Sequence, residues 1–257
     1  YGGGAFVLIY LLCLIVLGIP VMTMEFSLGR ASQASPVRMY RKLERPGTKW
    51  HIQGYLSLLG NISLMAFYTV VCGWMVYYFV KFLGGTNSEI GFVNMITNPA
   101  VNIKYLAVVV VVSFGILCFN LQGGLERVTK YMMIILFVLM IVLAIHSGTL
   151  SGAKEGLKFY LVPNLSAING SVIVGAMNQA FFTLSLGIGS MAIFGSYIGK
   201  DRSLLGESLN VVFLDTFVAV VSGLIIFPAC FTFNVEVGAG PSLLFDTMAS
   251  VFNNMSG

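Results

Sequence analysis

The sequence predicts an all-α membrane protein with six transmembrane helices, and three observations support this fold class. Hydrophobic residues form 57% of the 257 residues and charged residues only 9%, whereas about 25% of the residues of a soluble domain are charged. The mean hydropathy is +0.90. Uncharged apolar segments long enough to cross a bilayer recur along the chain. Too few charged residues remain to cover a water-facing surface, which excludes a soluble enzyme or a nucleic-acid-binding protein.

The six spans follow from the length that a bilayer requires. A helix rises 1.5 Å per residue, so about 20 apolar residues cross a hydrocarbon core about 30 Å thick. We expect a single transmembrane domain over residues 1–257, with spans at about 5–28, 55–82, 104–121, 130–147, 172–198 and 204–232. Residues 233–257 contain an apolar stretch too short to span, which predicts an interfacial or re-entrant segment on the outer side.

Positive charge alternates between the loops, as in multi-pass proteins whose cytoplasmic loops are rich in Lys and Arg. Residues 29–51 carry six cations, and the loops after the third and fifth spans add two each. These alternate loops hold ten of the fourteen cations. We therefore expect a multi-pass protein of the plasma or inner membrane, with the first residue and the C-terminal tail on the outer side.

The cysteine and histidine content argues against metal or redox chemistry. All four cysteines lie in apolar segments without a C-x-x-C pair, and the chain has two histidines. A disulfide framework or a zinc site is therefore not expected. A membrane redox enzyme would need paired histidine or cysteine ligands on its helices. No catalytic residue is assigned, and the chain is not expected to be an enzyme.

Two carboxylates lie in the spans or at their edge. Asp215 is inside the sixth span, where an ionisable group costs about 2.5–3.5 kcal/mol to insert and indicates function by default. We favour a cation-binding or proton-coupling role, the alternative being a protonated or hydrogen-bonded structural residue. Glu25 closes the first span. The alternative to a functional role for Glu25 is a simple carboxylate at the membrane edge. One mid-span carboxylate forms no ring of charge, which argues against a cation channel.

The fifth span is longer than the bilayer requires and contains Gly187 and Gly189 between hydroxyl side chains. Glycine lowers helix propensity, and irregular backbone is tolerated in a membrane only against protein or a water-filled cavity. We expect a broken helix of the kind that binds ions and substrates in transporters. Small residues for close helix packing are the alternative. Tyr68, in the second span, could donate its hydroxyl to a substrate carboxylate or to a neighbouring helix.

Three sets of short motifs carry a family resemblance. They are Gly2-Gly-Gly-Ala-Phe with Gly18-Ile-Pro and Met24-Glu-Phe-Ser-Leu-Gly-Arg30; Tyr68 with Trp74; and Phe181-Phe-Thr-Leu-Ser-Leu-Gly with Ser196-Tyr197 and Lys200-Asp201. In this order they resemble the second, third and sixth helices of the bacterial neurotransmitter:sodium symporter family. The resemblance covers the whole chain as helices two to seven. It implies part of a five-plus-five inverted-repeat sodium-symporter fold in which the broken fifth span is the family's sixth helix.

The resemblance also implies roles for individual residues. The residues implied to bind an amino-acid substrate are Leu64, Tyr68, Phe182, Thr183, Ser185 and Ile188. Tyr68 would hydrogen-bond the substrate carboxylate, and Thr183 and Asp215 would coordinate one of the co-transported sodium ions. Glu25 would support the unwound helix by accepting its free amides. Tyr197 would belong to the cytoplasmic gate.

Chloride is where the chain departs from part of the family. Tyr10, Gln179 and Thr183 match residues that form the chloride site of chloride-dependent members. Asp215 stands where those members have asparagine, and Ala219, one turn later, where some have serine. A fixed carboxylate would supply the negative charge that chloride otherwise brings beside sodium. We therefore expect that chloride is not required.

The implied function is sodium-coupled symport of a neutral, hydrophobic amino acid by alternating access. The family's first helix and its helices from the eighth onward have no counterpart here. The chain is therefore expected to be an incomplete segment that needs the missing helices of the same transporter, in the lipid bilayer, for a complete site. The alternative is a truncated, non-transporting membrane paralogue with a structural or partner-binding role.

Overall fold

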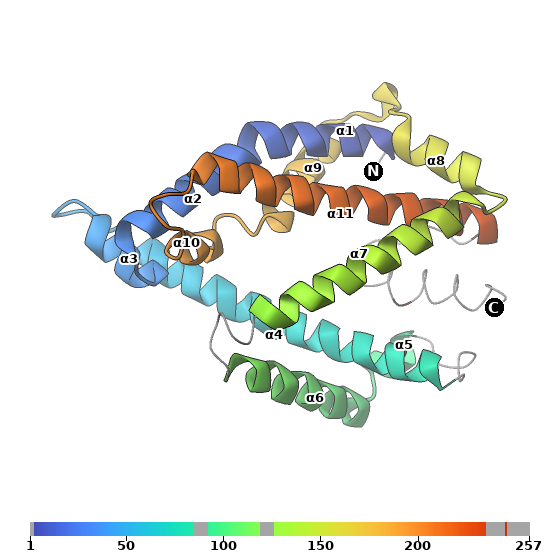
Figure 1. Ribbon diagram of the computed structural model, residues 1–257, viewed down its shortest axis with the longest axis horizontal. Helices are drawn as coiled ribbons and strands as arrows, with labels where there is room; N and C mark the ends of the chain where they lie inside the picture. The colour runs from blue at the N-terminus through green and yellow to red at the C-terminus, as the bar shows by residue number, and fades with distance from the viewer. Residues whose placement is uncertain (1–2, 85–91, 119–125, 235–244, 246–257) are drawn as a thin grey trace. The chain divides into compact units, whose positions relative to one another are not determined.

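The computed structural model describes residues 3–84, 92–118, 126–234 and 245, and helices form nearly all of their regular structure (Figure 1). Five described helices are long and apolar enough to cross a membrane: Gly4–Ser32, His51–Leu83, Pro99–Leu117, Glu126–Gly148 and Leu204–Phe233. The remaining expected span, the fifth (172–198), is the one predicted to be broken. The predicted all-α membrane fold is therefore confirmed. The expected outer tail, 233–257, lies outside the described residues except for positions 233, 234 and 245.

The first span is one continuous rod with a widened turn in its middle. It consists of α1 (Gly4–Cys13), the π-helix η1 (Leu14–Gly18) and α2 (Ile19–Ser32). Pro20 explains the widening, because its ring lacks an N–H and clashes with the carbonyl four residues earlier. The hydrogen-bond ladder therefore lengthens to five residues just before it.

The middle of the chain is a series of helices with lipid-facing character. They are α3 (Pro36–Leu43), α4 (His51–Leu83), α5 (Phe92–Ile96), α6 (Pro99–Leu117), α7 (Glu126–Gly148) and α8 (Ala153–Leu161). None of the residues of α6, all of which the structure describes, is buried. Large apolar side chains on α4, α6 and α7 are exposed. Such faces suit hydrocarbon rather than water.

The last part of the chain contains the broken span and a long final helix. Its elements are η3 (Leu165–Ala167), α9 (Gly170–Thr183), α10 (Ser190–Gly195) and α11 (Leu204–Phe233). The Asn169 side chain accepts a hydrogen bond from the Val172 N–H at 3.0 Å, and this cap starts α9. The helix that was expected over 172–198 is thus two helices, with residues 184–189 between them.

The chain divides into two compact units, which we describe separately, and the expectation of a single domain stays a prediction. The first unit comprises Tyr1–Leu64 and Lys158–Val220. Its core is built from buried residues of the first span, α9, the segment that follows α9, and α11: Tyr10, Leu14, Met22, Phe26, Ala176, Ala180, Leu184, Leu186 and Val212. Within it α1 packs on α9 and α10 packs on α2 (Figure 1).

Glycine allows the contact between α2 and α10 to be backbone on backbone. A Cβ at Gly29 would overlap the Ala192 carbonyl, and one at Gly195 would lie 2.5 Å from the Phe26 carbonyl oxygen. Only a residue without a side chain fits at such an approach. The short helix α10 is therefore held directly against α2.

The second unit comprises Met65–Leu157 and Val221–Gly257. Trp74 Nε1 donates to Asn102 Oδ1 at 2.7 Å and so joins α4 to α6. Gly152 and Gly156 lie against the backbone of α11 around Pro228, and the Gly152 N–H donates to Thr232 Oγ1 at 3.1 Å. Within the second unit these contacts hold α4 to α6, and the start of α8 to the end of α11.

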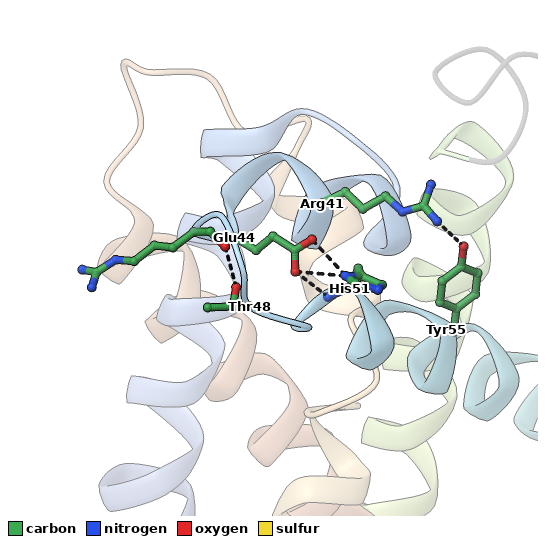
Figure 2. A network of polar contacts seen from close by, with 6 residues as sticks. Arg41, Glu44, Thr48, His51 and Tyr55 are labelled. Carbon is green, nitrogen blue, oxygen red and sulfur yellow. Dashed lines mark hydrogen bonds and ion pairs between the residues drawn. The ribbon is translucent and has the colours of Figure 1, made fainter.

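A polar network closes the turn between α3 and α4 (Figure 2). The backbone N–H of His51 donates to Glu44 Oε2 at 3.0 Å, and its Nδ1 lies 2.9 Å from Oε1. Because an ionised carboxylate only accepts, Nδ1 donates. Arg41 Nη2 donates to the Tyr55 hydroxyl at 2.6 Å. Desolvation raises the pKa of Glu44, but the hydrogen bonds from His51 outweigh it and hold this pKa below its usual range.

Glu44→Gln is expected to remove a contribution to stability that depends on pH. Because the pKa of Glu44 is lowered by folding, its contribution is present above the usual glutamate pKa of about 4.3 and is lost as pH falls through the lowered value. The melting temperatures of wild type and Glu44→Gln in detergent should differ at neutral pH and converge once the pH falls below the lowered pKa of Glu44. Glu155→Gln, an exposed site in α8, is the control. A constant difference at every pH would contradict the expectation.

Candidate functional site

The candidate site is built around the break between α9 and α10. Ser185, Gly187 and Gly189 have φ values of 52°, 88° and 72°, in the left-handed region. A Cβ at Gly187 would meet nothing within 4 Å, so glycine is needed there for its backbone conformation and not for space. The Leu186 N–H donates to the Phe181 carbonyl at 3.0 Å, five residues back, before the ladder ends. The expected break is therefore present at the two glycines.

Glu25 of α2 binds the backbone of the break. Its Oε1 accepts a hydrogen bond of 2.6 Å from the Gly187 N–H. The N–H groups of Met191 and Ala192, in the first turn of α10, also lie near this carboxylate. Amides in a first helical turn have no partner within the helix. A half-buried carboxylate thus satisfies backbone donors that the break exposes.

Two amide side chains of α4, which sequence reasoning missed, bind the carbonyls of the same segment. Gln53 Nε2 donates to the Gly187 carbonyl at 3.3 Å, and Asn61 Nδ2 donates to the Ile188 carbonyl at 2.7 Å. A detectable signal existed, because Gln53, Ser57 and Asn61 recur every four residues in an otherwise apolar helix. The break is therefore tied through its amides to α2 and through its carbonyls to α4.

A second polar group lies where α9 ends. Gln179 Nε2 donates to Thr183 Oγ1 at 3.1 Å. The hydroxyl of Tyr10, a residue of the core, lies close to Thr183 and within electrostatic range of Asp215. The buried Oδ2 of Asp215 has no hydrogen-bond partner among the described residues. The structure thus brings four of the predicted residues together and leaves one carboxylate oxygen of Asp215 unpaired.

The other predicted residues lie on the elements that surround the break or follow it. Phe182 is at the end of α9 and 55% exposed, and Ile188, between the two glycines, is half-buried. Leu64, half-buried on α4, belongs to the first unit. Tyr68, one turn later on α4, belongs to the second unit and is 42% exposed. Tyr197 lies between α10 and α11 and is 70% exposed.

The chemistry of this oxygen-rich group suits a hard cation better than a transition metal. Within the described ranges there is no cluster of three or more His, Cys, Asp or Glu side chains that could hold a metal ion. Hydroxyl, carbonyl and carboxylate oxygens are the ligands that hard cations prefer. A carboxylate, a threonine hydroxyl and the loosened backbone of a broken helix supply such ligands.

The chain matches known proteins over nearly all of its length. The model of the sodium:neurotransmitter symporter family matches residues 1–89 and 89–239. An uncharacterized sodium-dependent transporter of Bacillus subtilis, YhdH, is 36% identical over 261 residues, which is 99% of this chain and 58% of the relative. One of Haemophilus influenzae is 34% identical over 270 residues, or 99% of this chain and 59% of the relative.

A solved structure agrees with these relatives in fold. The crystal structure of MhsT in complex with L-phenylalanine superposes with a TM-score of 0.89 at 36% identity and covers 99% of this chain and 59% of that one. The chain thus spans about three fifths of the length of these proteins. The broken helix, the membrane-spanning helices and the family match agree, and the chain belongs to the sodium:neurotransmitter symporter family.

Proposed function

We propose that this chain is part of a sodium-coupled symporter that carries a neutral, hydrophobic amino acid across the cell membrane by alternating access. The observation that carries this proposal is the broken α9–α10 helix, whose backbone is held by Glu25 and which lies beside the polar group of Tyr10, Gln179, Thr183 and Asp215. The names of the relatives, which are sodium-dependent transporters, support the choice of ion. The L-phenylalanine bound to MhsT supports the choice of substrate class.

Sodium is assigned to Thr183 and Asp215. The buried Asp215 Oδ2 accepts no hydrogen bond from the described residues, and a buried carboxylate oxygen without a partner is costly. A sodium ion would neutralise this charge, and Thr183 Oγ1 can coordinate the ion through its remaining lone pair. Asp215 would also take the place of chloride as the negative charge beside sodium, with Tyr10 and Gln179 as remnants of a chloride site.

The substrate is assigned to the break and to the helix faces beside it. Ser185 and Ile188 would line the pocket with Phe182 and Leu64, which favours an apolar side chain. The role of Tyr68 in binding the substrate carboxylate stays a prediction from the sequence, as does that of Tyr197 in the cytoplasmic gate. Backbone groups freed by a helix break are the usual partners of substrates and ions at mid-membrane in transporters.

Alternating access gives the break its function. Sodium would favour the arrangement that is open to the outside, and substrate would then allow the outer side to close before both are released inside. No covalent chemistry is required, because the sodium gradient drives the cycle. The chain spans about three fifths of its relatives, so we propose that further helices of the same transporter complete the site.

Equilibrium binding tests this function. The full-length protein is purified in detergent, and labelled L-phenylalanine, L-leucine and L-alanine are titrated in sodium and in an equal concentration of potassium. Saturable binding that requires sodium would support the proposal and rank the substrates. A folded, full-length protein that binds none of them in either salt would contradict it and favour a non-transporting paralogue.

A further inference from the structure

One face of α4 presents polar groups to the break. Gln53, Ser57 and Asn61 are four residues apart, so they lie along a single face of the helix. Asn61 Nδ2 donates to the Ile188 carbonyl at 2.7 Å and to the Ser57 carbonyl at 2.8 Å. Leu64, three residues after Asn61, continues the same face. The helix that carries a proposed pocket residue is therefore bonded to the broken segment.

Asn61 also binds the start of the helix that follows the break. Its Oδ1 accepts a hydrogen bond of 2.8 Å from Ser190 Oγ, and Ser190 is the first residue of α10. Both ends of one carboxamide are thus engaged: the two N–H donors with Ile188 and Ser57, and the oxygen with Ser190. A half-buried amide with this many partners is costly to replace, since each lost bond leaves a polar group of the break unsatisfied.

The other side of the break is held by different chemistry. Glu25 accepts from the Gly187 N–H, and α10 packs on α2 through Gly29 and Gly195. The α2 side therefore fixes the amide of Gly187 and the helix beyond it, but the carbonyl of Ile188 is bonded to Asn61. Losing this bond would release the backbone at Ile188, so the position of this residue depends on Asn61.

We propose that Asn61 is a positioning residue that orients Ile188 and thereby sets the affinity and side-chain preference of the substrate pocket. The proposal rests on the proposed function, in which Ile188 lines that pocket. It assigns to Asn61 no contact with substrate or sodium. Its effect passes through the Ile188 carbonyl, which distinguishes it from a residue that only stabilises the fold.

Two variants of similar size separate positioning from general stability. Asn61→Asp keeps the acceptor for Ser190, but in its ionised form it cannot donate to Ile188. When it is protonated, its O–H can restore one donor. Asn61→Leu removes every hydrogen bond at any pH. Substrate affinity of Asn61→Asp should be at least roughly tenfold below wild type at neutral pH and recover as pH falls, whereas Asn61→Leu should not recover.

The binding measurement uses full-length protein in sodium, with labelled L-phenylalanine and L-alanine as probes. Glu25 and Asp215 can also titrate, so every variant is compared with wild type at the same pH. Asn94→Asp, at an exposed site in α5, controls for the added charge. The preference for L-phenylalanine over L-alanine should fall in Asn61→Asp and stay unchanged in Asn94→Asp.

Hydrogen exchange gives a second readout that does not require transport. Peptides covering residues 181–195 should exchange several times faster in Asn61→Leu than in wild type, while peptides from α7 should be unchanged. If wild type binds neither probe but this acceleration is seen, the proposed function fails. Asn61 then holds the break in place but sets the affinity of no substrate pocket. Equal losses in Asn61→Asp and Asn61→Leu at every pH, or unchanged affinity with unchanged exchange, would overturn the proposal.

Discussion

Replacing Glu25 by glutamine is expected to lower substrate affinity by roughly 100-fold. The carboxylate accepts from the Gly187 N–H at 2.6 Å, and the amides of Met191 and Ala192 lie near it. Glutamine keeps one acceptor oxygen but turns an NH₂ group toward these donors, so at least one N–H is left facing another donor. Bonds to an ionised acceptor are also about twice as strong as neutral ones. The break should therefore lose its preferred conformation.

The measurement is sodium-dependent binding of labelled L-phenylalanine to the full-length protein. Glu155→Gln removes the same charge from an exposed position in α8 and should bind as wild type does. Gel filtration and the melting temperature establish that Glu25→Gln is folded. An affinity within twofold of wild type in a folded Glu25→Gln would show that the carboxylate is only a membrane-edge residue.

The broken span could be predicted because its cause is local. Two glycines two residues apart, with hydroxyl side chains around them, disfavour a helix wherever the segment lies. The structure shows φ values of 88° and 72° at Gly187 and Gly189. The five continuous helices were equally accessible, since apolar length alone identifies them. Predictions of this kind need no knowledge of neighbouring helices.

The partners of the break could not be predicted, because they depend on how the helices pack. Asn61 and Gln53 are 127 and 134 residues from the groups that they bind. A polar residue in an apolar helix is compatible with a contact to any neighbour, and the sequence does not say which. The i, i+4, i+8 spacing of Gln53, Ser57 and Asn61 marks a polar face, but the segment opposite it is known only from the fold.

The π-turn at η1 was missed for a different reason. Pro20 predicts an irregularity in the hydrogen bonds of this helix, but packing decides whether the helix kinks or widens there.

Asp215→Asn is expected to make sodium binding dependent on chloride. Two unit charges about 4 Å apart attract by about 4 kcal/mol at an effective dielectric constant of 20. Removing the carboxylate should therefore raise the half-saturating sodium concentration by about 100-fold or more when the only anion is gluconate. Chloride should recover much of this loss. The wild-type Asp201 side chain is 82% exposed. The control Asp201→Asn should therefore show the same sodium affinity in chloride and in gluconate.

The recovery has a specific structural reason. An ionised aspartate offers only acceptors, so it repels an anion, whereas asparagine at position 215 brings an NH₂ group to the place where Gln179, Thr183 and Tyr10 already supply polar hydrogens. An anion held there would restore the negative charge beside sodium. Ala219, one turn along α11, cannot supply that charge instead. If the sodium affinity of Asp215→Asn is the same in chloride and in gluconate, Asp215 does not act in place of chloride, and its unpartnered oxygen must be explained by a neutral, protonated carboxyl.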